Sequence, residues 1–600
     1  MTQGEQIPGS GDVFEGRHLP DAAWARQIGR LGDEQLASGL KGLPVERQVE
    51  LALAVGWHDR VRIIRNSEEG AEIVKALPPE EVFLTMKGVE EEAALALFEL
   101  TTPDQLRLIL DLELWKDDRI DEDRVVTWLK HMLACGESKI IDFVKTADLE
   151  LLTLVMRKLV YLVPNEEGAT IPEELPSIMP DEFFTIFSNI PEETESVGLF
   201  LRIIRQADRD FFYKMLFLVN GAIEDESQEE ALRWRRSRLE EIGLLDFDEA
   251  VEIYGYIGEE EARRIGGVVP RYSRGAEVME QPAPTFPVLM NEKRTFFFEL
   301  LRSIEDGSLR ERLQREIAFS ANRLLVADAE HIGDLDSMKK ALARLFSLAN
   351  VGLLFLAGGD RDESLRVLRD VSLREVFQIG FSRVADLRSQ AAEIARKYWP
   401  EWRTRGFGFL EPPSDEILRG LLMRVPQYYE FGRPGAGFRD FETLDEVRDA
   451  RMAVEEIRVT AEMCFEKLGL PRPHEAKPAL AAIFATGLED ITLRNLVMTG
   501  FVNLILRGSF EIEPLSRDDL PGLFDKIFET GAAGRRVVKP ESRERLTDWL
   551  SQVTGFDAAK RPLLEKFAEA GIKGLEEEIG GVPAWQDVDP RYVRTLIFRK

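Results

Sequence analysis

The residue types that most often bind metals or act as nucleophiles are sparse in this 600-residue chain. The two cysteines, Cys135 and Cys464, lie far apart, and no HExxH motif or Cys/His set of the kind that holds zinc is present. The five histidines are scattered, at His18, His58, His131, His331 and His474. We therefore expect no metal, no cofactor and no catalytic residue, and we expect both cysteines to be small buried side chains.

A cluster of carboxylates lies between two predicted helices, at Asp117, Asp118, Asp121, Glu122 and Asp123. Carboxylate oxygens suit Mg²⁺ or Ca²⁺, but the spacing lacks the central glycine and the terminal glutamate of a calcium-binding loop. Acidic residues at the start of a helix also interact favourably with its dipole. We interpret the cluster as a solvated helix start, and weak binding of a divalent cation is the alternative.

One stretch, Trp399–Phe441, has the residue types of a recognition surface, because it interleaves aromatic residues with glycine, proline and arginine. Aromatic and arginine side chains anchor many protein interfaces, and they can also stack on single-stranded nucleic acid. The alternative is an irregular loop whose rings fill the space between two helical layers, which would avoid exposing so many rings. As a docking site, the stretch would make its contacts through Trp402, Arg403, Tyr428, Tyr429, Arg433 and Phe438.

The elements that must position this stretch are predicted to be helices. The clearest helical pattern in the chain lies in residues 77–143. Pro78–Pro79 suits a first helical turn, and Glu80–Glu81 follows at the positive end of the helix dipole. Thr102 is a predicted helix cap, with Pro103 in the first helical position. Each of these short helices carries an apolar stripe too broad to be buried alone, which is typical of stacked helical repeats.

A second stretch, Met179–Phe247, repeats this pattern at an offset of about 102 to 106 residues. Met179–Phe184 aligns with the proline-acidic helix start at Leu77–Val82, and Leu244–Phe247 aligns with Ile140–Phe143. We therefore predict an internal duplication in which the two copies superpose helix for helix.

The run LPPEEVFLTMKGVEEEAALALFELTTPDQLRLIL resembles the helical cytoplasmic N-terminal domain of the MgtE magnesium channels. It also resembles the armadillo-type helices of the flagellar motor switch protein FliG. The resemblance covers roughly Ile73–Leu114, with a weaker echo at Met179–Leu218, and it implies a right-handed superhelix of stacked helices. The chain lacks the nucleotide-sensing and membrane domains of MgtE, so the resemblance implies a magnesium-sensing module at most. The whole chain is also similar to an uncharacterised family of helical bacterial proteins, which implies no function.

Changes in composition along the chain predict its domain boundaries, the clearest being a segment rich in glycine and proline at 266–291. We expect a flexible tail at 1–20, helical repeat units at 21–165 and 166–265, a linker at 266–291, a helical domain at 292–398, the aromatic and glycine-rich loop region at 399–443, and a C-terminal helical domain at 444–600.

The chain is strongly acidic, with 78 Lys and Arg against 108 Asp and Glu, which gives a net charge of −30. This charge repels nucleic acid and anionic membranes as partners of the whole molecule. The N-terminal segment lacks the features of a signal peptide, and no apolar stretch reaches the roughly twenty residues of a membrane span. We therefore predict a cytoplasmic protein with neither a membrane span nor a nucleic-acid partner.

These observations favour an all-α protein of stacked helical hairpins, interrupted by an irregular aromatic insertion. We predict a non-enzymatic scaffold or regulatory adaptor whose concave helical face docks a protein partner. Two alternatives stay open: an enzyme whose site is assembled from dispersed residues, and a module that senses divalent cations such as magnesium.

Overall fold

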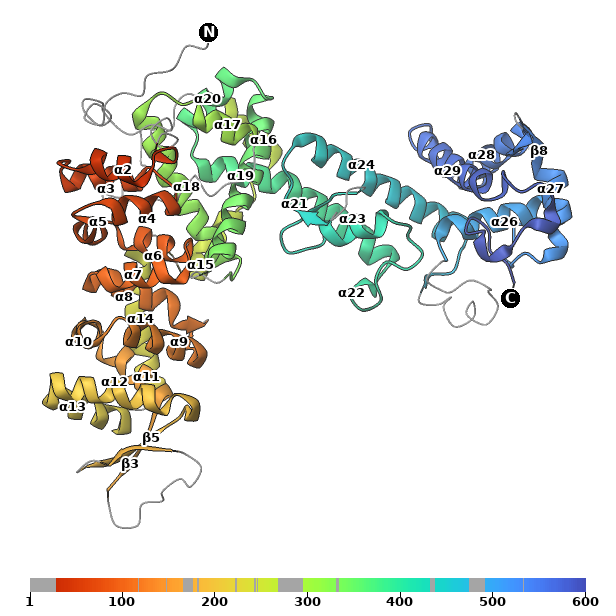
Figure 1. Ribbon diagram of the computed structural model, residues 1–600. Helices are drawn as coiled ribbons and strands as arrows, with labels where there is room; N and C mark the ends of the chain where they lie inside the picture. Colours follow the sequence, from red (N-terminus) through yellow and green to blue (C-terminus); the bar gives the residue numbers. More distant parts are fainter. Residues whose placement is uncertain are drawn as a thin grey trace, which may run out of the picture. The chain divides into compact units, whose positions relative to one another are not determined.

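The computed structural model describes residues 28–599, apart from 117, 147, 166–175, 181–182, 222–223, 242–243, 245, 268–294, 331–333, 432–436, 474–490 and 532–533. The predicted tail at 1–20, nearly all of the predicted linker at 266–291 and the docking residue Arg433 lie outside the described residues. The fold is predominantly α-helical, as predicted (Figure 1).

The chain forms two compact units, and the first comprises Met1–Gly255, Arg264–Phe346 and Arg361–Phe377. Its N-terminal half stacks short helices in sequence order (Figure 1). These are α2 (Asp33–Leu40), α3 (Val45–Leu53), α4 (Trp57–Asn66), α5 (Gly70–Ala76), α6 (Pro79–Lys87), α7 (Glu91–Leu100), α8 (Pro103–Glu113), α9 (Glu122–Ala134), α10 (Glu137–Thr146), α11 (Leu149–Leu159), α12 (Thr194–Ala207) and α13 (Arg209–Gly221).

The helix starts predicted in residues 77–143 are confirmed. Pro79 occupies the first turn of α6, and Pro103 that of α8. Thr102 caps α8 through a reciprocal pair of hydrogen bonds with Gln105, so both orphan backbone N–H groups find an acceptor. Helix α6 ends at Gly88, where a Cβ atom would lie 2.0 Å from a ring carbon of Trp57, so this close helix contact requires glycine.

A fully buried ion pair joins three of these helices. The Arg60 guanidinium on α4 donates to the Ala52 carbonyl on α3 at 2.8 Å. It also donates to the Glu81 carboxylate on α6 at 2.6 Å and to the Thr85 hydroxyl at 2.8 Å. Both charged side chains are 2% exposed. With its charge paired and several donors bonded, Arg60 is a structural arginine.

The predicted helix start at Met179–Phe184 is wrong, because this segment belongs to a sheet. Strands β3 (Val160–Pro164), β5 (Phe184–Ser188) and β4 (Ser177–Pro180) form an antiparallel sheet in the order β3-β5-β4. The residues of β5 are largely aromatic and β-branched, which favours a strand, and Pro180 is tolerated because β4 is an edge strand. The two aligned stretches therefore do not superpose helix for helix at their first element.

After α13 the first unit continues with α14 (Glu224–Glu241), which packs against α8 and α11. Its Arg238 donates to the Asp111 carboxylate at 2.6 Å and to Asp148 at 2.6 Å. The remaining helices that lie wholly in this unit are α15 (Phe247–Val251), α17 (Phe296–Arg302), α18 (Gly307–Ala327) and α20 (Arg361–Asp370).

Three helices contribute residues to both units: α16 (Glu259–Gly267), α19 (Leu335–Ala357) and α21 (Leu373–Tyr398). Within the described part of the chain, α19 alone is long and apolar enough to cross a membrane by length and composition. In its most apolar window, 67% of the residues are buried within the protein.

The second unit comprises Tyr256–Arg263, Ser347–Asp360 and Gln378–Lys600. Helix α24 (Leu444–Ala461) runs on into a π-helical turn, Glu462–Lys467. Near the C-terminus, Ile597 N–H donates to the Thr499 hydroxyl at 2.9 Å and so ties the chain end to α26 (Leu493–Arg507). The other elements of the second unit are α22 (Trp402–Arg405), α23 (Ser414–Leu421), β6 (Tyr428–Tyr429), β7 (Phe438–Arg439), α27 (Leu520–Ile527), β8 (Phe528–Thr530), β9 (Arg536–Val538), α28 (Pro540–Thr554) and α29 (Arg561–Ile579).

Candidate functional site

The predicted docking residues Trp402 and Arg403 lie together on α22. The Trp402 ring stacks on Phe407, with ring centroids 5.5 Å apart and planes 8° from parallel. The Arg403 guanidinium lies over the Trp402 ring at 5.3 Å. Next to them, Trp399 is 3% exposed and donates its indole N–H to the Gly408 carbonyl at 2.9 Å. Much of the surface of these rings therefore contacts other residues of the second unit.

The other described docking residues form the β6–β7 hairpin. Tyr428 packs edge-on against the buried Phe441, with centroids 5.5 Å apart, and the Arg439 guanidinium covers its ring at 4.8 Å. Tyr429 packs against Phe438 across the hairpin at 5.5 Å. The structure thus groups the predicted residues into two sets, one on α22 and one on the hairpin. Both sets keep some exposed surface.

A second group of aromatic side chains, in the first unit, was not predicted as a site. Phe183 is 47% exposed and Phe217 is 52% exposed. Their ring centroids lie 5.7 Å apart, and Tyr213 meets Phe183 edge-on at 5.3 Å. We call Phe183, Tyr213 and Phe217 the aromatic patch. It lies where α13 adjoins the β3–β5–β4 sheet.

Local structure explains why these rings face outward. In α13 the core face takes Phe212, Met215, Leu216 and Val219. Tyr213 and Phe217, four residues apart, share a different flank of the helix. Phe183 precedes β5, whose first residue, Phe184, is buried, and successive residues of an extended chain point to opposite sides.

The sequence did contain a signal for this patch. The run Phe211–Leu218 has seven aromatic or aliphatic residues in eight positions, with Lys214 as the exception. A helix on the surface of a globular protein buries one stripe, so a run this apolar must leave some rings outside the core unless another layer covers them. This run lies within Met179–Phe247, the predicted second repeat, where a neighbouring layer of helices was expected to cover it.

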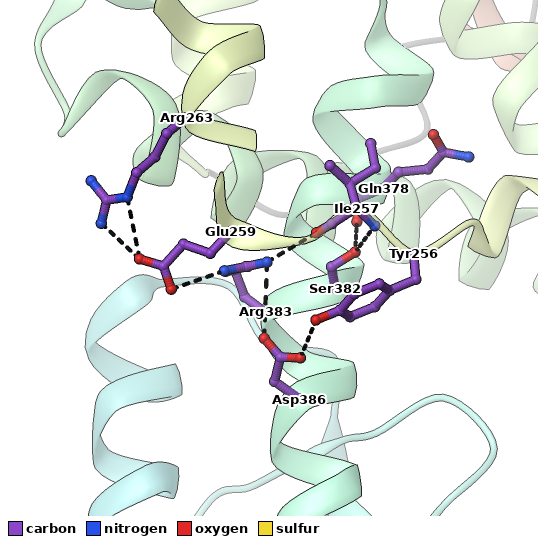
Figure 2. Close-up of polar contacts among 8 residues, drawn as sticks. All are labelled: Tyr256, Ile257, Glu259, Arg263, Gln378, Ser382, Arg383 and Asp386. Atoms are coloured by element: carbon purple, nitrogen blue, oxygen red, sulfur yellow. Dashed lines mark hydrogen bonds and ion pairs between the residues drawn. The ribbon is translucent and has the colours of Figure 1, made fainter. Parts of the chain in front are cut away.

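A well-connected polar cluster in the second unit contains a serine, a tyrosine and carboxylates, the residue types of many catalytic sites (Figure 2). Ser382 on α21 accepts a hydrogen bond from Ile257 N–H at 2.8 Å and donates to the Gln378 carbonyl at 2.7 Å. Tyr256 donates its hydroxyl proton to Asp386 at 2.7 Å. The Ser382 proton goes to a helix carbonyl, not to a general base, so Ser382 is not arranged as a nucleophile.

The buried cation of this cluster, Arg383, also bonds to other residues of the protein. It donates to the Ile257 carbonyl at 3.0 Å and pairs with Glu259 at 3.4 Å, and its guanidinium lies over the Phe355 ring at 4.9 Å. Figure 2 shows the polar contacts that join Tyr256, Ile257 and Glu259 to residues of α21. The cluster therefore fixes the segment Tyr256–Arg263 against α21.

The acidic cluster begins a helix, as we interpreted it. Asp121 caps α9 by accepting a hydrogen bond from Arg124 N–H at 3.1 Å, and Asp118 pairs with Arg236 at 3.6 Å. Asp117 lies outside the described residues. Across the described ranges, no group of three or more His, Cys, Asp or Glu side chains could hold a metal ion.

The two cysteines lie in different environments. Cys464 is fully buried in the π-helical turn, where burial and the nearby Glu411 carboxylate raise the pKa of its thiol. Cys135 is partly exposed, and burial together with Glu99 raises its thiol pKa as well. Raised pKa values leave little thiolate at neutral pH, so neither thiol is activated as a nucleophile.

Comparisons with known proteins give one result. No curated protein and no solved structure matches the chain, so the resemblance to MgtE and FliG finds no support there. A family model, described as a family of unknown function, DUF6178, matches residues 37–599. Since this match covers most of the chain, the protein is a member of the DUF6178 family.

Proposed function

We propose that this protein is a non-enzymatic interaction scaffold and that the aromatic patch of the first unit is a docking surface. The observation that supports the proposal is that Phe183 and Phe217, each about half exposed, lie in direct ring contact with one another. Contiguous exposed aromatic side chains on a soluble protein mark interaction sites more often than chance placement does.

The geometry of the patch suits an interface anchor. The Phe183 ring already contacts both Tyr213 and Phe217, so binding a partner needs little side-chain ordering. Tyr213 is further fixed by Arg209, whose guanidinium lies over its ring at 5.7 Å. Preorganised aromatic and arginine side chains are the residues that dominate binding energy in measured interfaces.

The occupant that fits this surface is an amphipathic segment of another protein. Its apolar side chains would cover the rings of Phe183 and Phe217, while its polar face stays in water. A nucleic-acid strand could also stack on rings, but the net charge of −30 opposes its approach.

The β6–β7 hairpin is a second candidate docking surface. Phe431 is 68% exposed and Phe438 lies at the edge of the hairpin beside Tyr429. Tyr429 and Phe438 belong to the set predicted from the sequence, whereas Phe431 does not, and a partner could contact all three independently of the aromatic patch.

The test compares Phe217→Ser with Phe247→Ser. Phe247 is 51% exposed and lies in the same unit outside the patch, so it is a matched control for the loss of one exposed ring. Stoichiometric partners are first identified by purifying the tagged protein from its own cells, and each is then titrated as a pure protein against both variants.

We expect Phe217→Ser to weaken binding by roughly 30-fold, as for an interface hot spot, and Phe247→Ser to leave Kd within about twofold. Equal affinities of both variants would overturn the aromatic patch as the docking surface. Loss of binding in Phe438→Ala, with Phe217→Ser unaffected, would move the interface to the hairpin.

A further inference from the structure

A cavity of about 110 Å³ in the second unit shares no lining residue with the aromatic patch or the β6–β7 hairpin. Its walls come from the loop before α23 and from helices α24, α26 and α29. An apolar cavity of about 150 Å³ can enclose one benzene molecule. This space is smaller but open to solvent on one side, so a bound molecule can extend beyond its walls.

One side of the cavity is apolar. Ile457 on α24, Leu493 on α26 and Phe567 on α29 line it, and each is buried against the core. Such a surface would cover an aliphatic or thioether side chain of a small molecule.

The polar side of the cavity carries two ion pairs. Arg494 on α26 approaches the Glu411 carboxylate at 2.5 Å through Nη1, and Lys566 on α29 pairs with Glu456 on α24. All four side chains line the cavity, so its formal charge is balanced. A ligand with one net charge would disturb this balance, whereas an uncharged molecule or a zwitterion would preserve it. Of these two, only the zwitterion could also form charge-assisted hydrogen bonds with the charged side chains.

Several polar groups at the cavity still lack partners among the described residues. The Nε–H of Arg494 is buried and has no hydrogen-bond acceptor. The hydroxyls of Ser414 and Thr460 line the cavity without a side-chain hydrogen bond to the described part of the protein. A buried donor without an acceptor is unfavourable, so a bound carboxylate that accepts from Arg494 would be stabilised.

The backbone around the cavity is also unusual. Phe409, a cavity residue, has a φ of +70°, which is rare for a residue with a side chain, and its carbonyl accepts from Leu493 N–H at 2.7 Å. Helix α24, which carries Thr460, continues directly into the π-helical turn. Both features are found more often at binding sites than elsewhere in proteins.

We propose that this cavity binds a small zwitterion, namely an α-amino acid with an apolar side chain. Arg494 and the two hydroxyls bind its carboxylate, and Glu411 and Glu456 accept hydrogen bonds from its ammonium group. The apolar side chain packs on Ile457, Leu493 and Phe567. The site lies wholly in the second unit and does not depend on the proposed docking surface.

The test is calorimetric titration of the full chain with L-leucine. The probes 4-methylpentanoate, which lacks the ammonium group, and 3-methylbutylamine, which lacks the carboxylate, have nearly the same apolar part. We expect each to bind at least tenfold more weakly than L-leucine. Equal binding of either single-charge probe would overturn the assignment to a zwitterion.

The variant Arg494→Gln should weaken L-leucine binding at least tenfold. Arg507→Gln is its matched control, because Arg507 lies on the same helix, is 34% exposed against 35% for Arg494, and is also paired with a carboxylate. Equal effects of the two variants would overturn the role of Arg494.

The variant Glu456→Gln provides a second test that does not remove the Arg494 side chain. It should weaken L-leucine binding but not that of 4-methylpentanoate, which should be unchanged or stronger because the cavity gains a net positive charge. Absence of heat and of any shift in Tm with L-leucine, L-methionine and L-phenylalanine, each at about 10 mM, would overturn the proposal altogether.

Discussion

The Trp399–Phe441 region and the aromatic patch contain similar residue types, but the region buries several of its rings and exposes others on and beside the β6–β7 hairpin. In the first, Trp399 is buried, Trp402 stacks on Phe407, and Tyr428 packs against Phe441. In the second, Phe183 and Phe217 leave about half of their surface in water. Aromatic content alone therefore does not distinguish a docking surface from a core, because what matters is whether a neighbouring layer covers the rings.

The largest expected difference between the regions is in stability. Trp399→Ala should lower the free energy of unfolding of the second unit by about 3–5 kcal/mol, because it removes a buried ring and leaves a cavity. Urea unfolding followed by circular dichroism measures this change. Trp585→Ala is the control in the same unit, since Trp585 is 37% exposed, and a loss as large as that of Trp399→Ala would refute the distinction.

A smaller loss of stability is expected where the substituted ring is only half-buried. Trp402→Ala should cost about 1–2 kcal/mol, since the variant loses the stack with Phe407 and the contact with Arg403. Phe217→Ser should cost about 1 kcal/mol or less, since its ring is half in water. Thermal unfolding of both variants checks the order, and a larger loss for Phe217→Ser would show that the patch belongs to the core.

The smallest expected effect is a pH dependence at the hairpin. Burial, together with Glu446 and Asp449, raises the pKa of Tyr428 above its usual value near 10. A raised pKa favours the protonated form in the folded state, so this contribution is complete below pH 10 and is lost as pH rises through the folded-state pKa. Stability above pH 10 should therefore fall less steeply in Tyr428→Phe than in the wild type.

The control for this measurement is Tyr592→Phe, which changes an exposed tyrosine in the same unit. Its alkaline stability curve should follow that of the wild type. Identical curves for Tyr428→Phe and the wild type would show that folding does not raise the pKa of Tyr428.

The local starts of several helices could be predicted because their causes are local. Proline in a first turn and a Thr–Gln capping box act within one turn of chain, so α6 and α8 begin at or beside the predicted residues. The apolar stripes likewise predicted a helical fold with stacked neighbours. These features need no information about distant residues.

The sheet and the two aromatic surfaces could not be predicted in this way. Met179 and Pro180 take strand geometry because β4 pairs with β5, which also pairs with the distant β3. Likewise, Phe212 is buried and Phe217 exposed on one helix because packing layers cover one flank and not the other. The cavity at Arg494 could not be predicted for the same reason, because the segments that form its walls are spread between residues 409 and 570 of the chain.

The buried Arg60 has a consequence for how the N-terminal helices unfold. Stacked repeats can fray from one end, because each contacts its neighbours alone. Arg60 instead bonds to α3 and α6 from α4. Opening α4 or α6 leaves one member of the buried ion pair without its counter-charge, and opening α3 removes an acceptor from a buried guanidinium. We expect native-state hydrogen exchange to report one common opening free energy for the amides of α3, α4 and α6, so this end of the stack melts as a single cooperative block.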